Sequence, residues 1–167
     1  MSPRDHRRHS VERIGGYLHK ITPIVDEAGR VVHHAVAPLM VEVTPRDLIQ
    51  IVVGAALLSI PVGLTEEAWD LGQQLPGANI AVLAAVSVLF IALFVYYDFY
   101  HHHLRGHVAS YAIRVAATYL ISLAIAGALL TLIQRCPWGV DNLLALKRMV
   151  LVAFPSSMSA ALSDSLR

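Results

Sequence analysis

The sequence predicts an all-α membrane protein with four hydrophobic helices and a short N-terminal β-hairpin. Of the 167 residues, 56% are hydrophobic and only 15% are charged, and the mean hydropathy is +0.56, a composition that is unusual for a water-soluble domain. Uncharged runs approaching the ~20 residues that a bilayer core requires recur along the chain. The first 47 residues, by contrast, are polar.

Residues 1–44 are predicted to form a polar cytoplasmic segment. Two runs rich in Val and Ile, Lys20–Val25 and Arg30–Val36, flank Asp26-Glu27-Ala28-Gly29, which has the composition of a turn. We therefore expect a β-hairpin, with a further β-prone run at Leu39–Val43. Because two or three short strands are barely stable alone, this segment needs a partner subunit or the membrane domain to pack against.

Residues 45–167 are predicted to form the transmembrane domain. Thr44 is a natural N-cap, Pro45 suits the first helical position, and Asp47 complements the helix dipole. The uncharged runs that follow predict helices over about residues 46–70, 78–102, 108–134 and 141–165.

The fourth of these segments is ambiguous. Asp141 caps a helix that carries Lys147 and Arg148 in its second turn, and the uncharged stretch after them contains Pro155. The full segment is long enough to cross a bilayer, but its apolar part is short. A kinked spanning helix and a re-entrant helix both fit this pattern.

The distribution of basic residues predicts the orientation. The polar leader, residues 1–47, holds seven Lys and Arg residues, whereas the connection at residues 66–78 holds none. Because basic loops stay on the cytoplasmic side, we expect a multi-pass protein of the cell (inner) membrane with a cytoplasmic N-terminus.

An acidic cluster follows the first hydrophobic run. Glu66, Glu67 and Asp70 lie close together, with Glu66 and Asp70 on one helical face, where like charges favour a bound cation. In a symmetric oligomer such residues form a ring at a pore mouth, a device that concentrates cations. The alternative is that they are solvated residues at a helix end.

A histidine cluster follows the second run. Asp98 is followed by His101, His102 and His103, and histidine beside a carboxylate titrates near neutrality or binds zinc-like metals. This pattern suggests pH sensing or modulation. Whether the cluster binds a metal is left open, because three adjacent histidines on one helix point in three directions.

Polar residues also interrupt the third and fourth hydrophobic segments. On the third, Tyr111, Arg114, Thr118 and Ser122 share one stripe, which suggests either a water-filled path or packing between helices. On the fourth, a proline break and neighbouring polar groups can line an ion path or simply kink a packing helix; the candidates are Pro155, Ser156, Ser159, Ser163 and Asp164.

Several function classes are disfavoured. The chain has no Gly-rich phosphate loop, no His-Glu-x-x-His zinc helix and no Gly-x-Ser-x-Gly elbow, so we expect neither an enzyme nor a cofactor. Its formal net charge of +1 and the lack of a dense basic run argue against a nucleic-acid partner. Cys136 is the single cysteine and cannot form an intrachain disulfide.

Several short motifs resemble a prokaryotic family of integral membrane proteins known only as a domain of unknown function. They are Pro45-Arg46-Asp47, Gly63-Leu64-Thr65-Glu66-Glu67, Tyr97-Asp98 and the tail around Phe154-Pro155 and Ser163-Asp164. The resemblance covers residues from about Val31 to the C-terminus, and it implies a bacterial-type inner-membrane location, several spans and no established activity. His102-His103 and Phe154-Pro155 are also similar to small potassium channels of bacteria and lysosomes, whose Phe-Ser-Asp signature is absent here.

Together these features predict a homo-oligomeric channel for an inorganic cation or a proton. Four short helices leave little room for a private pore, so the path would most simply lie on the symmetry axis. The alternative is a non-conducting membrane scaffold that recruits a soluble partner through its N-terminal segment.

Overall fold

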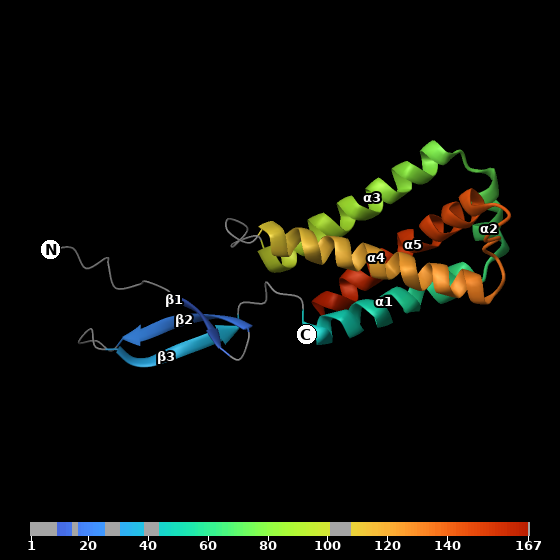
Figure 1. Cartoon of the computed structure of the whole chain (residues 1–167). Coiled ribbons are helices and arrows are strands. Elements are labelled where there is room, and N and C mark those ends of the chain that lie inside the picture. The colour runs from blue at the N-terminus through green and yellow to red at the C-terminus, as the bar shows by residue number, and fades with distance from the viewer. Residues whose placement is uncertain (1–9, 15–16, 26–30, 39–43, 101–107, 167) are drawn as a thin grey trace. The chain divides into compact units, whose positions relative to one another are not determined.

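The computed structural model describes residues 10–14, 17–25, 31–38, 44–100 and 108–166. The chain divides into two compact units, Met1–Glu42 and Val43–Arg167. The first unit contains a small β-sheet and the second contains the helices (Figure 1).

The sheet has three antiparallel strands in the order β1 (Ser10–Ile14), β2 (Tyr17–Val25) and β3 (Val31–Pro38). The predicted hairpin is confirmed as β2 and β3, whereas β1 was not predicted. Pro23 lies beyond the last residue of β2 that pairs with β1, so it occupies a stretch with one neighbouring strand, where a sheet tolerates proline. The expected run at Leu39–Val43 lies outside the described residues.

The predicted four hydrophobic helices are confirmed. All four are long and apolar enough to cross a membrane, and they are α1 (Pro45–Gly63), α3 (Gly77–Val95), α4 (Val108–Leu132) and α5 (Asn142–Ser165). A short helix, α2 (Glu66–Gln74), lies at the end of the bundle where α1 ends and α3 begins (Figure 1). A π-helical turn, η1 (Tyr96–Tyr100), extends α3.

The helix expected over residues 46–70 is two helices, because the backbone turns after Gly63. The carbonyl of Val62 accepts hydrogen bonds from both the backbone N–H and the hydroxyl of Thr65, and the carbonyl of Gly63 accepts one from the Trp69 indole. These side chains satisfy carbonyls that end α1. The Trp69 side chain therefore helps to cap the C-terminal end of α1.

The fourth hydrophobic segment is one continuous helix. α5 runs through Pro155 without a break in its helical assignment, and its 24 residues are sufficient to cross a bilayer. Of the two interpretations left open by its sequence, the spanning helix agrees with this length and continuity.

α5 lies at the centre of the bundle, where it packs against each of the other α-helices, and its most extensive contact is with α1. α1 and α5 run antiparallel, so the Gln50 side chain near the start of α1 donates to the carbonyl of Leu166 at 2.8 Å. A Cβ atom at Gly54 would lie 2.7 Å from the carbonyl oxygen of Ser159 and 2.5 Å from the Cβ of Ser163, so only glycine permits this approach. Outward-facing apolar residues, including Leu57, Phe90 and Leu120, suit contact with lipid.

Candidate functional site

A buried cluster of charged side chains lies at the end of the bundle where α1 and α4 begin and α5 ends. Arg114 donates to Asp164 through Nε at 2.8 Å and through Nη2 at 3.0 Å, and Nη2 also donates to Asp47 at 2.9 Å. Arg114 is fully buried, and Asp164 and Asp47 are 1% and 5% exposed. Three helices are therefore joined by one ion cluster, which we call the charge cluster.

Local structure fixes each member of the charge cluster. Asp47 is the third residue of α1 and completes a capping box, in which its carboxylate accepts from the backbone N–H of Thr44 and its own N–H donates to the Thr44 hydroxyl. Asp164 is the next-to-last residue of α5, and Arg114 lies in the second turn of α4. The close packing of α1 on α5 at Gly54 brings the two carboxylates to one guanidinium.

The charge cluster pairs two carboxylates with one guanidinium, so its formal charge is −1 when all three groups are ionised. The bidentate contact to Asp164 is the strongest geometry available to arginine and carboxylate. Removing ionised groups from water is costly, and ionisable side chains that face a bundle interior in a membrane mark ion or proton pathways in many proteins. This combination makes the charge cluster the candidate functional site.

The polar stripe expected on the third hydrophobic helix is present. Arg114, Thr118 and Ser122 are all fully buried along α4. Each hydroxyl donates to the carbonyl four residues earlier, Thr118 at 2.9 Å and Ser122 at 2.7 Å. The stripe therefore faces the protein interior, and its hydroxyl oxygens keep acceptor capacity. Tyr111 is half-buried and donates to the carbonyl of Ala92 on α3 at 2.9 Å.

The polar residues expected on the fourth helix also face inward. Ser156 is fully buried, and its hydroxyl is 2.7 Å from that of Ser59 on α1. Ser159 and Ser163 are half-buried beside Gly54, and Pro155 is half-buried. Ser156 and Asp164 therefore lie inside the protomer, whereas the sequence analysis placed a possible pore on the axis between subunits.

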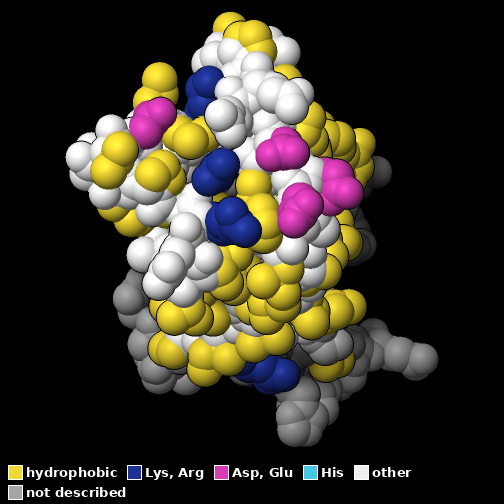
Figure 2. Space-filling model, turned by 90° about the vertical axis from the view of Figure 1, so that its right-hand side faces the viewer, with side chains coloured by type: hydrophobic (Ala, Val, Ile, Leu, Met, Phe, Trp, Pro, Cys, Tyr) yellow, Lys and Arg dark blue, Asp and Glu magenta, His cyan; other side chains and the backbone are white. Residues whose placement is uncertain are grey.

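The acidic residues Glu66, Glu67 and Asp70 lie elsewhere. All three are exposed on α2, at the opposite end of the bundle from the charge cluster. Figure 2 shows this end, where acidic side chains lie beside basic ones. Cations attracted by these three residues, as the sequence predicts, would therefore gather at the protein surface and not at the buried charge cluster.

The predicted histidine cluster lies partly outside the described residues. Asp98 is exposed within η1, and His101, His102 and His103 lie outside the described residues. Within the described ranges, no group of three His, Cys, Asp or Glu side chains could hold a metal ion.

Sequence reasoning located all three members of the charge cluster without joining them. Asp47 was interpreted as a helix-dipole residue, Arg114 as part of a polar stripe and Asp164 as a candidate pore residue. The signal that indicates such a pairing is an arginine next to an uncharged run, together with one aspartate at the start of a hydrophobic segment and a second aspartate at the end of another.

A family model described as "Putative integral membrane protein (DUF2391)" matches residues 26–164. The matched range includes β3, the helices up to the next-to-last residue of α5, and each member of the charge cluster. No protein of curated function and no solved structure matches the chain.

Proposed function

We propose, since the chain belongs to the DUF2391 family of integral membrane proteins, that it is a small homo-oligomeric channel for protons or an inorganic cation. The observation that carries this proposal is the charge cluster: two carboxylates share one arginine inside an apolar bundle. An excess carboxylate in such surroundings attracts a proton or a small cation.

The buried hydroxyls support a path beyond the charge cluster. Thr118 and Ser122 follow Arg114 along α4, and Ser59 and Ser156 meet between α1 and α5. Hydroxyl oxygens can accept from water or a hydrated cation while they donate to a helix carbonyl. Glu66, Glu67 and Asp70 would concentrate cations at the opposite end.

The surface of α4 supports self-association. Ala124 and Ala128, one helical turn apart on α4, are exposed and therefore do not pack within the protomer. Small residues on a lipid-facing helix allow the helix of a second subunit to approach closely. The seven basic residues of the leader favour an inner-membrane orientation with a cytoplasmic N-terminus.

The second candidate is a scaffold, and a separate observation favours it. Among the strand side chains that the structure describes, none is buried, and Ile24 is 52% exposed. A sheet of three short strands is barely stable alone and gains stability from a surface that covers it. A soluble partner bound to the sheet would supply that surface.

Ion flux into liposomes distinguishes the two candidates. The purified protein is reconstituted, and potassium, sodium and proton gradients are applied separately. A channel gives flux that rises with protein content, and Asp164→Asn lowers it by at least about tenfold, since an ion-binding carboxylate is lost. Asp141→Asn is the matched control, because Asp141 is an exposed N-cap where asparagine caps equally well.

Two results would contradict the channel. One is the absence of flux for every ion in a folded oligomer, which favours the scaffold. The other is equal flux from Asp164→Asn, Asp141→Asn and the unmodified chain, which removes the charge cluster from the path. Deleting residues 1–40 provides an independent comparison, because a channel keeps basal flux whereas a scaffold loses its partner.

A further inference from the structure

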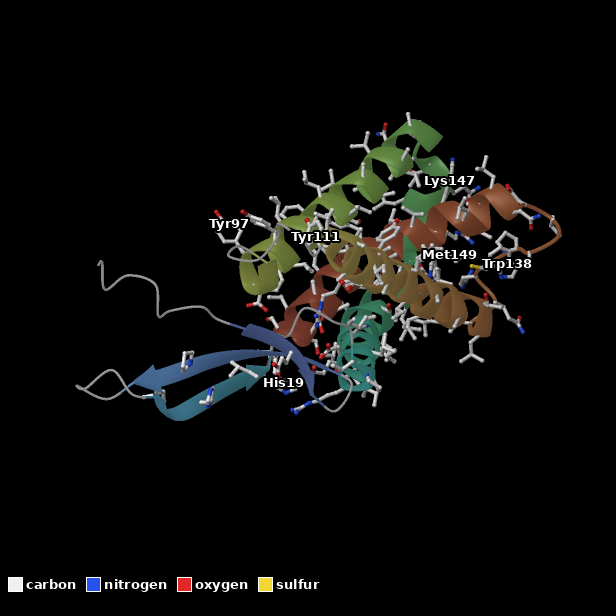
Figure 3. The ribbon with its side chains drawn as sticks, turned by 60° about the vertical axis from the view of Figure 1, so that its left-hand side comes forward. His19, Tyr97, Tyr111, Trp138, Lys147 and Met149 are labelled. Atoms are coloured by element: carbon white, nitrogen blue, oxygen red, sulfur yellow. The ribbon has the colours of Figure 1, made fainter. Side chains whose placement is uncertain are left out.

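Three basic side chains gather at the end of the bundle opposite the charge cluster. Arg135 follows α4, and Lys147 and Arg148 lie in the second turn of α5, beside α2. Lys147 is at the other end of the bundle from Tyr97 and Tyr111 (Figure 3). We call Arg135, Lys147, Arg148 and the adjacent Trp69 the basic site.

The three cations of the basic site have neutral partners. Arg148 donates to the carbonyls of Trp69 at 3.2 Å and of Arg135 at 2.7 Å, and Lys147 donates to the carbonyl of Leu75 at 2.7 Å. Within the described part of the chain, none of the three forms an ion pair with a carboxylate. Carbonyl groups orient these side chains but leave their positive charge unneutralised.

The helices that carry the basic site are closely packed. A Cβ atom at Gly72 would lie 2.6 Å from the Cγ of Arg148 and 3.3 Å from its Cα, so α2 sits directly against α5. The hydrogen bonds of Arg148 then connect α2, α5 and the segment that follows α4. A ligand that enters the basic site meets side chains already held in place, which lowers the entropy lost on binding.

Arg135 supplies the exposed part of the basic site. Its guanidinium carbon lies 3.8 Å from the centroid of the Trp69 ring, and the residue is exposed. Stacking on an aromatic ring occupies the face of a guanidinium and leaves its edge N–H groups to bind an anion. That planar edge fits the oxygens of a phosphate in a bidentate manner.

We infer that the basic site binds a phosphate group, which Arg135 contacts from the exposed side while Lys147 and Arg148 neutralise its charge. The basic site lies near the ends of the candidate spans, with Lys147 and Arg148 in the second turn of the last one. A tryptophan is typical of the headgroup region, so an anionic phospholipid presents phosphate at this depth. Glu66, Glu67 and Asp70 are exposed and form no ion pair with the three cations, so water and salt screen their repulsion.

Native mass spectrometry of the full chain in detergent tests this inference. The protein is titrated with dioctanoyl-phosphatidylglycerol and, separately, with dioctanoyl-phosphatidylcholine. We expect tighter binding of phosphatidylglycerol, and we expect Arg135→Gln to weaken it by about tenfold, the typical effect of losing a charge-assisted contact. Because Arg135 is exposed and its backbone carbonyl is retained, this variant keeps the bond from Arg148.

The controls separate a site from general attraction. Arg46→Gln removes another exposed arginine, at the start of α1, and should leave phosphatidylglycerol binding unchanged. A thermal-shift titration with inorganic phosphate distinguishes the two sources of the phosphate group. If phosphate stabilises the unmodified protein and Arg135→Gln loses this stabilisation, free phosphate is a ligand. If phosphate does not stabilise the protein although lipid binding is retained, the ligand is the lipid headgroup. Equal loss in Arg46→Gln and Arg135→Gln, no loss in either variant, or no preference for phosphatidylglycerol over phosphatidylcholine would overturn the inference.

Discussion

The two ends of the helical bundle carry similar charged groups in opposite circumstances. In the charge cluster, Arg114 is fully buried and bound to the carboxylates of Asp47 and Asp164. At the other end, Arg135, Lys147 and Arg148 contact carbonyls and an indole ring, and the acidic residues of α2 are exposed. Charges at the first end depend on one another, whereas those at the second remain available to water, ions or lipid.

The largest effect is expected where an ion partner is removed from the charge cluster. Arg114→Met leaves two buried carboxylates without their guanidinium, which should lower the free energy of unfolding by about 3–5 kcal/mol. SDS titration in mixed micelles measures this change. Arg135→Met is the matched control at the exposed end and should change stability by less than about 1 kcal/mol.

A charge-neutral variant sharpens this test. Combining Arg114→Met with Asp47→Asn and Asp164→Asn removes the uncompensated charge, so it should recover part of the stability lost by Arg114→Met alone. If the triple variant is no more stable than the single one, packing by the arginine and not its charge holds this end together.

A second comparison concerns how closely helices approach at each end. Gly54→Ala places a methyl group against backbone atoms of α5, whereas Gly72→Ala meets chiefly the side chain of Arg148. Backbone cannot move without shifting a helix, so Gly54→Ala should cost about 1–3 kcal/mol and Gly72→Ala less. Gly77→Ala, where nothing lies within 4 Å, is the control in the same unfolding assay. Equal losses at Gly54 and Gly77 would contradict the close contact of α1 with α5.

The sequence was sufficient to predict features set by neighbouring residues. The cap at Thr44, the β2–β3 hairpin and the inward stripe of Arg114, Thr118 and Ser122 all follow from local patterns, and the structure contains each of them. Pro61 and Gly63 indicate a kink near the end of the first hydrophobic run, but the end of α1 at Gly63 was missed, because it depends on hydrogen bonds from Thr65 and Trp69 that periodicity does not reveal.

The charge cluster could not be assembled from local patterns. Arg114 is 50 residues from Asp164 and 67 residues from Asp47, and these separations are closed only by the packing of α1, α4 and α5. Helix periodicity identifies the face on which a residue lies but not the helix that covers that face. Pairing between distant residues is therefore information that the tertiary structure adds.

The acidic residues of α2 should affect ion flux without affecting stability. Glu66→Gln combined with Asp70→Asn removes two exposed charges, so the free energy of unfolding should change by less than about 0.5 kcal/mol. If these carboxylates concentrate cations, flux at low ionic strength should fall about threefold and the difference should shrink at high salt. Unchanged flux and selectivity in a conducting protein would exclude them from the pore mouth.

The smallest effect concerns the labelling of Cys136, which tests whether water reaches buried residues at the end of the bundle near α2. Cys136 is 8% exposed, and burial raises the pKa of its thiol, although the nearby Thr131 side chain and the charge of Arg148 act in the opposite direction. A raised pKa reduces the thiolate fraction at neutral pH, so maleimide should label Cys136 slowly and faster as the pH rises. Val140, 91% exposed, supplies the control: in a chain with Cys136→Ala, Val140→Cys should react at least about tenfold faster at pH 7. Comparable rates at the two positions would show that water reaches Cys136. Of the groups compared here, only those of the charge cluster would then be shielded from water.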